Sequence, residues 1–429
     1  MSVLASAERP PGEGVDGIAG LAPLARMAFA GADLGSVKAD LLERLRRNEN
    51  DADALMDLST VSQLTGQRDL GLAMQKFALD IRRVYRVANT VQPAGIRLLG
   101  IFTPGDLAEN NALEFLTEGS DIRLDMLYVT PGRPLPDRLP EHDVAMVAIC
   151  ESDRNRPLLR WLERLLQSWP RPVICPPHRI GRLSRDGVGR VLRSAPGIVM
   201  PLTARIGRRT LAMAGSSECP VAALGPEVEF PIIVRPVDSQ KGHGLAKLDD
   251  PQSIAQYLRE RPENAFYVAR YVDYRGTDGQ FRKYRIVLID GRPYACHMAI
   301  SGQWVVHYVT AGMRESAAKR AEEARFFATF DDDFASRHRM ALRSIAERLE
   351  LEYAGIDCGE TPDGKLLLFE VDSGMTVHSM DPVDLFPYKQ PQMAKVFHAF
   401  RRMLVDASTR PRAGRSGGKS AAGLPLRPG

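Results

Sequence analysis

Hydrophobic residues recur along the chain at two spacings, and the change from one to the other predicts the order of the elements. Between residues 36 and 80 the spacing is helical, as in the run Leu41, Leu42 and Leu45. From Gly95 onward, short apolar runs bounded by turn residues predict strands. The strands are expected at residues 96–102, 123–129, 143–149 and 172–177, with an amphipathic helix between residues 158 and 169. Strands that alternate with helices predict a parallel α/β sheet.

The same pattern divides the chain into five segments. Residues 1–34 mix Pro, Gly and Ala without a sustained period and are expected to be a poorly ordered lead-in, or a short helix packed on another part of the chain. Residues 35–92 are expected to be helical, residues 95–180 to form an N-terminal α/β domain, and residues 181–405 to form a second, larger domain. A basic, disordered tail is expected at residues 406–429. The predicted class is therefore α/β (α+β), preceded by a small helical hairpin.

The helical segment resembles one tetratricopeptide helix-turn-helix unit between Asn50 and Asp80. The matching residues are Ala54, Leu55, Leu58, Leu64, Gly66, Ala73, Phe77, Ala78 and Leu79. Only one unit is visible, whereas solenoids need about three stacked repeats to bury a continuous face. Two interpretations follow: a docking surface for a peptide, or a helical cap on the domain that comes next.

Composition and charge exclude several classes of protein. The 429 residues are 44% hydrophobic and 26% charged, which is ordinary for a globular protein of about three domains. The net charge of +4 comes from the tail, which holds five basic residues and no acid from Ser408 onward, so no specific nucleic-acid partner is expected. The five cysteines are scattered and form no Cys-x-x-Cys motif, which predicts reduced thiols in a cytoplasmic protein. No window reaches about 18 apolar residues, so no membrane partner is expected.

A glycine-rich turn is the first cluster with chemical character. A predicted strand at residues 230–238 leads into Ser239–Gly244, where two glycines flank His243 and follow Lys241. Such a turn exposes backbone N–H groups to an anion and can fold over phosphates. The spacing is not that of a P-loop. The alternative is an ordinary glycine-rich hairpin turn.

A basic strand is the second cluster. Residues 281–291 alternate and end in an Asp-Gly turn, so Lys283 and Arg285 share one face, where they can meet a polyanion. The alternative is a solvated face. The charged run at residues 315–325 has mixed signs at helical spacing and predicts a solvated helix.

Three carboxylates form the third cluster. Two strands joined by a Pro-Asp-Gly turn place Asp357 opposite a strand on which Glu370 and Asp372, two residues apart, point to the same face. Carboxylates among apolar residues raise one another's pKa unless a cation neutralises them. Oxygen ligands in this sparse form suit Mg²⁺, with Mn²⁺ as the alternative. The other interpretation is an exposed hairpin with acids on its wet face.

Taken in order, these clusters resemble the ATP-grasp superfamily over roughly residues 176–405, in the carboxylate-amine ligase branch similar to ribosomal-protein glutamate ligases. The resemblance implies that Arg235 and Arg185 hold the nucleotide, and that Arg285, with Lys283 beside it, faces the transferring phosphoryl group. The residues implied to contact ATP elsewhere are Ser239, Lys241, Gly242 and Gly244 over the phosphates, Ala269, Arg270 and Tyr271 at adenine, and Asp273 at the ribose. The implied metal ligands are Asp357, Glu370 and Asp372.

The chain departs from the family at several positions. Arg235 stands where Lys is commoner, Asp372 stands where Asn is usual, and residues 373–378 replace the usual Asn and Pro-Gly turn. These differences put the acceptor substrate in doubt. Three histidines, His297, His307 and His378, lie in or beside the region, and His378 is the first candidate to bind substrate or to take a proton from the attacking amine.

The activity implied is ATP-dependent joining of a carboxylate to an amine through an acylphosphate, with release of ADP. The expected partners are a carboxylate and an amine on an amino acid, a peptide or a protein, and a second copy of the chain is an alternative partner. Two other functions stay open. One is a small-molecule kinase of the same fold, and the other is a nucleotide-binding scaffold without turnover.

Overall fold

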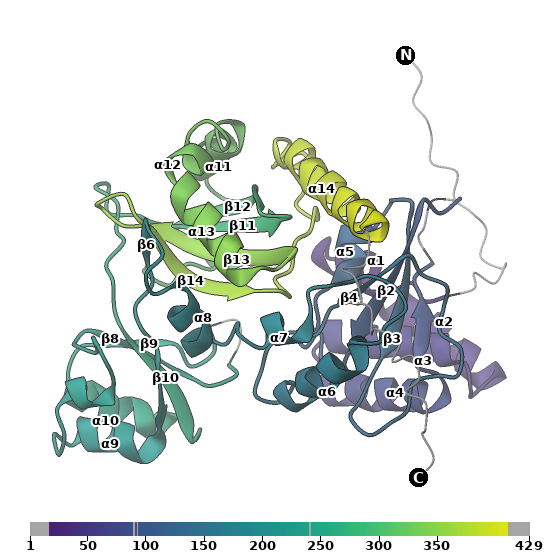
Figure 1. The fold of residues 1–429 in the computed structure, drawn as a ribbon, viewed down its shortest axis with the longest axis horizontal. Coiled ribbons are helices and arrows are strands. Elements are labelled where there is room, and N and C mark those ends of the chain that lie inside the picture. Colours follow the sequence, from purple (N-terminus) through teal and green to yellow (C-terminus); the bar gives the residue numbers. More distant parts are fainter. Residues whose placement is uncertain (1–16, 89–90, 92, 240–241, 411–429) are drawn as a thin grey trace, which may run out of the picture.

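The computed structural model describes residues 17–88, 91, 93–239 and 242–410. Figure 1 shows three sheets, with the first on one side of the molecule and the second and third on the other. The predicted α/β class is confirmed. Within the described residues, no helix combines the length and the apolar character that crossing a bilayer requires. The five cysteines are all unpaired.

Four helices open the described chain: α1 (Leu21–Phe29), α2 (Gly35–Arg47), α3 (Ala52–Leu64) and α4 (Arg68–Ile81). Helix α1 lies inside the segment expected to be a lead-in, so the short packed helix is the correct alternative there. Its Ala22 and Leu24 are buried. Asp51 caps α3 by accepting the N–H of Ala54 at 3.0 Å, and Gly66 turns the chain toward α4 with a φ of 80°.

The α3–α4 hairpin packs on the first sheet. Leu55 and Leu79 share one apolar core with the strands of this sheet, and Gln75 exchanges two hydrogen bonds with the backbone of Gly105, at 2.8 and 3.0 Å. These contacts favour the interpretation of the hairpin as a helical cap. Peptide docking on its outer face stays a prediction.

The first sheet is the predicted parallel sheet with one extra edge strand. Its strands, in the order β1-β3-β2-β4-β5, are β1 (Val84–Arg86), β2 (Ile96–Phe102), β3 (Ile122–Tyr128), β4 (Val144–Val147) and β5 (Val173–Ile174). Strands β2 to β5 are parallel, whereas β1 pairs antiparallel with β3. The three residues of β1 were too few to produce a recognisable pattern. The accompanying helices are α5 (Leu113–Thr117), α6 (Arg156–Leu166) and α7 (Pro177–Ile180).

The second sheet is antiparallel and has its own apolar core. Its order is β7-β10-β8-β9, and its core residues include Leu211, Ile232 and Phe266. Its strands are β7 (Ala204–Gly207), β8 (Ile232–Pro236), β9 (Ala246–Leu248) and β10 (Ala265–Arg270), covered by α9 (Arg208–Gly215), η1 (Val221–Leu224) and α10 (Pro251–Glu260).

The third sheet runs in the order β12-β11-β13-β14-β6, and only β6 pairs in parallel. Its strands are β6 (Ile198–Val199), β11 (Phe281–Ile289), β12 (Arg292–Ser301), β13 (Tyr353–Glu360) and β14 (Leu366–Asp372). The helical elements around it are α8 (Arg185–Leu192), η2 (Tyr308–Thr310), α11 (Ala317–Ala328), α12 (Phe334–Arg337), α13 (Arg339–Leu349) and α14 (Lys389–Thr409). Helix α14 continues past residue 405, the expected end of the domain, so the boundary was placed too early. The tail from residue 411 lies outside the described residues.

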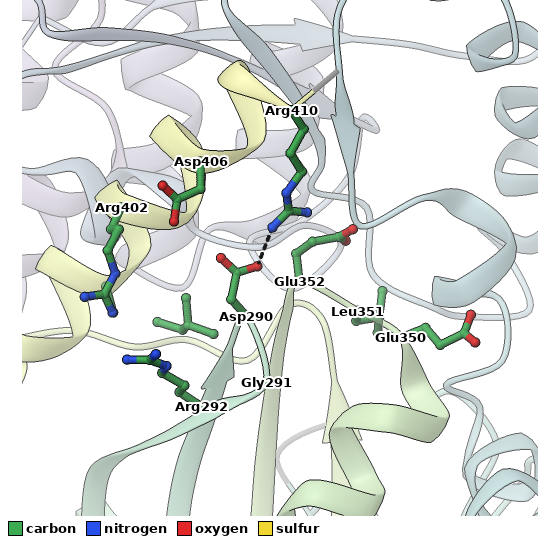
Figure 2. A pocket seen from close by; sticks show the side chains of 11 residues that line it. Asp290, Gly291, Arg292, Glu350, Leu351, Glu352, Arg402, Asp406 and Arg410 are labelled. Atoms are coloured by element: carbon green, nitrogen blue, oxygen red, sulfur yellow. Dashed lines mark hydrogen bonds and ion pairs between the residues drawn. The ribbon is translucent and has the colours of Figure 1, made fainter. Parts of the chain in front are cut away.

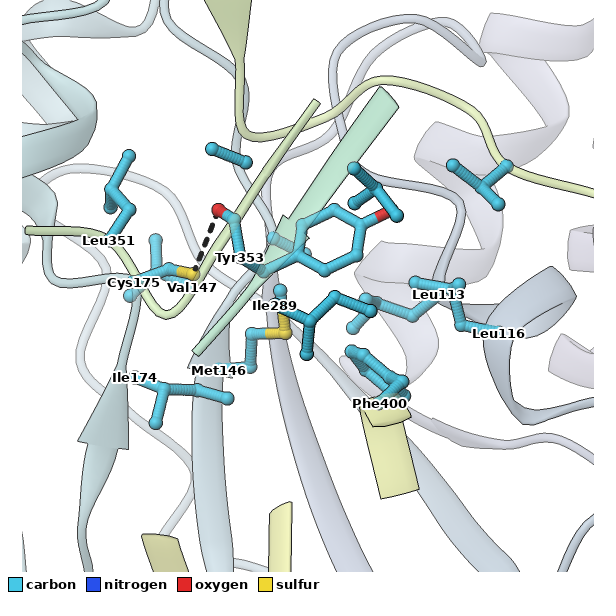
Figure 3. Close-up of a cluster of buried hydrophobic side chains, with 14 of the residues drawn as sticks. Leu113, Leu116, Met146, Val147, Ile174, Cys175, Ile289, Leu351, Tyr353 and Phe400 are labelled. Atoms are coloured by element: carbon cyan, nitrogen blue, oxygen red, sulfur yellow. Dashed lines mark hydrogen bonds between the residues drawn. The ribbon is translucent and has the colours of Figure 1, made fainter. Parts of the chain in front are cut away.

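One apolar core joins the first and third sheets. Figure 3 shows Tyr353 of β13 and Phe400 of α14 packed with Leu113, Met146 and Ile174 of the first domain. The rings of Tyr353 and Phe400 have centroids 5.8 Å apart. The first sheet therefore holds the third sheet in a fixed position through α14.

The charged run at residues 315–325 forms much of α11, but this helix is not simply solvated. Glu323 is fully buried under it, and its Oε1 accepts the backbone N–H of Met298 at 3.0 Å. The mixed-sign pattern therefore predicted the helix correctly and the position of Glu323 wrongly.

Candidate active site

A basic and an acidic residue face each other on neighbouring strands of the third sheet. Arg285 on β11 lies opposite Asp357 on β13, and direct cross-strand neighbours point to the same face. Arg285 donates two hydrogen bonds to the two carboxylate oxygens of Asp357, at 2.8 and 2.9 Å. Lys283, two residues earlier on β11, places its Nζ 2.7 Å from Asp357 Oδ2. Lys283 and Arg285 therefore share one face of β11 as predicted, and Asp357 pairs with both of them.

The two cations keep Asp357 ionised although its side chain is only 2% exposed. Burial alone would raise the pKa of Asp357, but the charge and hydrogen bonds of Arg285, together with Lys283, lower it below its usual value. The ion pairs in turn hold both cations over this part of the sheet. A phosphate group that enters here meets positive groups whose positions are already fixed.

The other two carboxylates lie on β14. Glu370 pairs with Asp357 across the strands and Asp372 pairs with Gly355. Asp372 is well enclosed, and burial together with the neighbouring charge of Glu370 raises its pKa to about 6. Its Oδ1 accepts the N–H of Gly374 at 2.9 Å. Within the described residues Asp372 therefore has a backbone hydrogen bond but no basic side chain in ion-pair contact.

The donor chemistry of Glu370 and Asp372 fits a hard divalent cation that completes its shell with water and phosphate oxygens. Asp357 fits less well, because both of its oxygens are held by Arg285 and Lys283. Across the described ranges, no three His, Cys, Asp or Glu side chains converge closely enough to hold a metal ion. The three-carboxylate magnesium site stays a prediction, best supported for its two β14 ligands.

Arg185 reaches Glu370 from another element. It is the first residue of α8, which begins after Ser184, whose side chain accepts the N–H of Gly187. Arg185 donates to Glu370 Oε1 at 2.6 Å and to the carbonyl oxygen of Phe369 at 3.0 Å. The predicted basic residue of the linking segment thus stands beside a predicted metal ligand.

Arg235 comes from β8 of the second sheet and is mostly buried. It donates from Nε to the Ser239 hydroxyl at 3.1 Å and from Nη2 to the Ser239 carbonyl. Burial, followed by the positive charge of Arg185, lowers its pKa to about 10, while Glu370 acts in the opposite direction. Arg185 and Glu370 therefore lie near enough to Arg235 for their charges to act on it, and we call this junction of the second and third sheets the cleft.

The glycine-rich loop lies between these sheets. Gly242 and Gly244 have φ values of 73° and 66°, which glycine adopts without strain. A Cβ on Gly242 would lie 2.8 Å from the ring of His307, and one on Gly244 would lie 2.6 Å from Pro236. Ser239 is tied to Arg235, whereas Lys241 lies outside the described residues. The predicted loop therefore does meet the third-sheet side of the cleft, at His307.

The expected adenine-binding segment ends β10. Strand β7 pairs with β10 from Ala265 as far as Val268. The next two residues, Ala269 and Arg270, pair with β8 on one edge, and within the described chain no strand pairs with their other edge. Tyr271 donates its N–H to Pro231 and packs its ring edge-on against Trp304, at 5.8 Å.

Beyond this segment, Asp273 is exposed and accepts the N–H of Arg275 at 3.0 Å. Hydrogen-bonded pairs alternate along an antiparallel ladder, and Tyr271 donates to Pro231, so Arg270 points its backbone groups to the open edge while those of Ala269 face β8. The assignment of Asp273 to a ribose gains no support.

His378 lies apart from the charged face of the sheet. Its ring packs between Phe29 of α1 and Phe115 of α5, with centroids 6.2 and 5.9 Å away, and its Nδ1 accepts the N–H of Met380. Burial lowers its pKa to about 4. Arg285 reaches this loop only at the carbonyl oxygen of Thr376. The structure therefore does not bring His378 into hydrogen-bond contact with the other predicted residues.

Residues of the first domain border the cleft and were not predicted. Asn111 donates to the carbonyl oxygen of Ser373 at 2.6 Å, and a Cβ on Gly374 would lie 2.0 Å from Cys150 Sγ. Asp153 pairs with Arg205 of β7, at 2.7 Å, which ties the first domain to the second sheet. Ligands of parallel sheets bind beyond the carboxyl ends of the strands. The position of Cys150 shortly after β4 could therefore have marked it as a candidate.

A separate cavity of about 380 Å³ lies at the other end of β11 and β13 (Figure 2). The cavity is lined by acidic residues and by three arginines, Arg292, Arg402 and Arg410. Arg410 pairs with Asp290 at 3.3 Å. It contains none of the predicted site residues. We call it the distal cavity.

Comparisons with known proteins give similarity at the level of structure. No protein-family model and no curated protein matches the chain. A RimK domain ATP-grasp protein from Sphaerobacter thermophilus is 17% identical, with 72% of this chain and 99% of that one covered and a TM-score of 0.41. D-alanine–D-alanine ligase from Bacillus anthracis, complexed with ATP, is 14% identical (73% and 97% covered, TM-score 0.44).

VanG D-Ala:D-Ser ligase from Enterococcus faecalis is also 14% identical, with 72% and 99% covered and a TM-score of 0.43. These superpositions are too loose to transfer an activity to this chain. What the chain does must follow from its own side chains.

Proposed function

We propose that this protein is an ATP-dependent carboxylate-amine ligase that works in an ATP-grasp type of cleft and releases ADP and phosphate. The observation that carries the proposal is the meeting of basic residues from three separate elements around the acids of β13 and β14. Arg185 of α8 and Lys283 and Arg285 of β11 contact these acids, and Arg235 of β8 lies near enough for the charges of Arg185 and Glu370 to act on it.

The nucleotide is expected to lie between the second and third sheets. The open edge of β10 after Val268 offers the backbone groups of Arg270 to adenine, with Tyr271 and Trp304 as aromatic neighbours. Arg235 and the glycine-rich loop, including Lys241, then lie over the phosphates. Bidentate guanidinium groups suit phosphate oxygens better than a lysine does, which is consistent with arginine at position 235.

Phosphoryl transfer from ATP to a substrate carboxylate requires charge stabilisation and no protein nucleophile. A carboxylate oxygen attacks the γ-phosphorus, the bond to the β-γ bridging oxygen breaks, and ADP leaves. Arg285 and Lys283 stabilise the charge that develops on the γ-phosphoryl oxygens, and Asp357 keeps both in position. Mg²⁺, with Mn²⁺ as the alternative, supplies further positive charge when bound, and Glu370 and Asp372 are the residues that would hold it.

The second half-reaction consumes the acylphosphate. The nitrogen of an amine attacks the acyl carbon, the carbon–oxygen bond to phosphate breaks, and an amide-type bond remains. We propose an amino acid, a peptide or a protein as the substrate. The loop that follows β14 contacts the first domain at Asn111 and Cys150, so acceptor contacts are expected from both domains.

The test is product analysis. The protein is incubated with ATP, Mg²⁺ and pools of amino acids and short peptides, and the products are examined by mass spectrometry together with ADP and phosphate release. A condensed product with equal ADP and phosphate supports the ligase. A phosphorylated product with ADP alone identifies a kinase, and ATP binding without ADP identifies a scaffold.

Two variants locate the reaction in this cleft. Glu370→Gln and Arg285→Ala should each lower turnover by at least about 100-fold, because each removes a charge that acts on the transferring group. Arg292→Ala, which changes an exposed arginine of the distal cavity, is the matched control and should leave turnover unchanged. Full activity in either cleft variant would refute the site.

A further inference from the structure

The charged row on the third sheet has a fourth member, on the edge strand β12. Strand β12 pairs with β11 so that His297 lies directly opposite Arg285. Since direct cross-strand neighbours share a face, His297 extends the row beyond Arg285. From β14 to β12, the row reads Glu370, Asp357, Arg285 and His297.

The imidazole of His297 is held in place without using its nitrogens. Its ring lies against the ring of Tyr308, with centroids 4.7 Å apart. Within the described residues, neither ring nitrogen makes a hydrogen bond to another group, and the residue is only partly covered. Both nitrogens therefore keep their capacity to hydrogen-bond with a substrate.

Tyr308 is fixed by a buried polar cluster, which we call the Lys389 cluster. The Tyr308 hydroxyl donates to Glu323 Oε2 at 3.2 Å, and Lys389 Nζ lies 3.2 Å from Glu323 Oε1 and 2.9 Å from Asp381 Oδ2. Tyr388 donates to Glu323 Oε2 at 2.7 Å. With its hydroxyl anchored in this way, the ring of Tyr308 gives His297 a rigid support.

The charges around His297 favour a neutral ring. Lys283 and Arg285 approach it from β11 and Lys389 from α14, whereas Asp357 on β13 acts in the opposite direction. Burial, followed by the charge of Arg285, lowers the pKa of His297 well below its usual value. The neutral ring is a weak base but keeps a lone pair, and the amine becomes strongly acidic once its nitrogen bonds to the acyl carbon, so it can lose a proton to this ring.

We infer that His297 is the base of the second half-reaction, taking the proton from the amine as its nitrogen attacks the acylphosphate. The inference rests on the proposed ligase function and adds the residue that function lacks. The nitrogen–carbon bond forms, the carbon–oxygen bond to phosphate breaks, inorganic phosphate leaves, and the proton moves from the amine nitrogen to an imidazole nitrogen before it passes to solvent. His297 takes this role in place of His378, whose Nδ1 is occupied by Met380.

Hydroxylamine separates the two half-reactions. It is largely unprotonated at neutral pH, so it captures an acylphosphate as a hydroxamate without help from a base. The experiment uses the full chain with ATP, Mg²⁺ and the pool of amino acids and short peptides, with and without hydroxylamine. Hydroxamate reports the first half-reaction, and amide product reports both.

In His297→Gln, we expect amide formation to fall by about 100-fold or more, whereas hydroxamate formation stays within about threefold of the unchanged protein. His398→Gln, which changes an exposed histidine of α14, is the matched control and should alter neither rate. ATP affinity and the unfolding midpoint of both variants check that the fold is intact.

The pH profile and a rescue give two more signatures. The residual amide formation of His297→Gln should rise about tenfold per pH unit below the pKa of the amine, because only the free amine still reacts. In His297→Ala, added imidazole should restore part of the amide rate and leave the hydroxamate rate unchanged.

Three outcomes overturn the inference. Unchanged amide formation in His297→Gln removes the need for this base. An equal loss of amide and hydroxamate assigns His297 to the first half-reaction or to folding. If the unchanged protein forms neither product, the proposed ligase function itself fails, and this result is distinguishable from the first two.

Discussion

One cluster of charged residues lies on the strands of the third sheet and another lies beside β12, between α11 and α14, and they differ in how completely their charges are matched. In the Lys389 cluster, the buried Glu323 receives hydrogen bonds from Met298, Tyr308 and Tyr388, and Lys389 lies between Glu323 and Asp381. In the cleft, Asp372 receives one backbone hydrogen bond and lies beside Glu370.

The Lys389 cluster is complete without a ligand, and the cleft is not. Buried polar groups whose partners are all present stabilise a fold, whereas charges left without a partner mark a place where a ligand completes the set. The difference predicts that changes in the first cluster act on stability and changes in the second act on turnover.

The largest effect is expected when the Lys389 cluster loses its cation. Lys389→Met leaves the buried Glu323 and Asp381 without a positive neighbour and should lower the free energy of unfolding by about 3–5 kcal/mol. Urea unfolding measures this change. Lys76→Met on the exposed face of α4 is the control, expected to cost less than about 0.5 kcal/mol. Equal losses in the two variants would show that the cluster is not the complete unit described.

The next effect concerns the geometry of the cleft. Arg285→Lys keeps the charge but loses the two parallel hydrogen bonds to Asp357. We expect turnover, measured as ADP release with the substrate pool, to fall by about 100-fold with little change in the unfolding midpoint. Arg402→Lys in the distal cavity should have no effect on either quantity. A large shift in the midpoint of Arg285→Lys alone would place Arg285 with the structural cluster.

A buried acid outside both clusters sharpens the comparison through pH. Asp57 of α3 accepts backbone N–H groups of Ala19 and Gly20, at 2.9 and 3.1 Å, and burial raises its pKa from 3.8 to about 6. Between these two values the folded state binds more protons than the unfolded state, so this residue makes stability fall as the pH rises from about 4 to 6.

The contribution of Asp57 is of the order of 1–3 kcal/mol and should be absent in Asp57→Asn. Unfolding free energies of the two proteins at pH 4 and pH 7 measure it. If the difference between the proteins is the same at both pH values, Asp57 is not protonated in this range.

The smallest effect is expected at the distal cavity. Its arginines are exposed, and Arg292 has no acidic partner within the described residues. Arg292→Ala should change the free energy of unfolding by less than about 0.5 kcal/mol and leave turnover unchanged. Altered turnover in this variant would mean that the distal cavity communicates with the cleft along β11 and β13.

The alternation of residues predicted the parts of the site that lie on one sheet. The shared face of Lys283 and Arg285 was expected from their spacing, and so was the shared face of Glu370 and Asp372. Arg185, which donates to Glu370, lies 185 residues before it in the chain. The spacing of residues predicts no contact over so long a separation. Only the resemblance to a known family suggested it.

Two errors have a physical cause. Glu323 was expected in solvent because its neighbours in sequence are charged, but Tyr308, Tyr388 and Lys389 surround it from other elements. His378 was favoured because it follows the acidic strand closely, whereas the loop after Gly374 carries it toward Phe29 and Phe115. Proximity in the chain was a poor guide wherever a loop intervenes.

The separate core of the second sheet has a mechanical consequence. The first and third sheets share one continuous apolar core, so shifting one against the other would expose many buried side chains. The second sheet keeps its apolar residues to itself and meets its neighbours mainly through polar and edge contacts, such as Asp153 with Arg205 and Gly242 beside His307. Swinging this sheet outward therefore disturbs little buried apolar surface. If the proposed function holds, nucleotide exchange is expected to use this motion while the first and third sheets stay together.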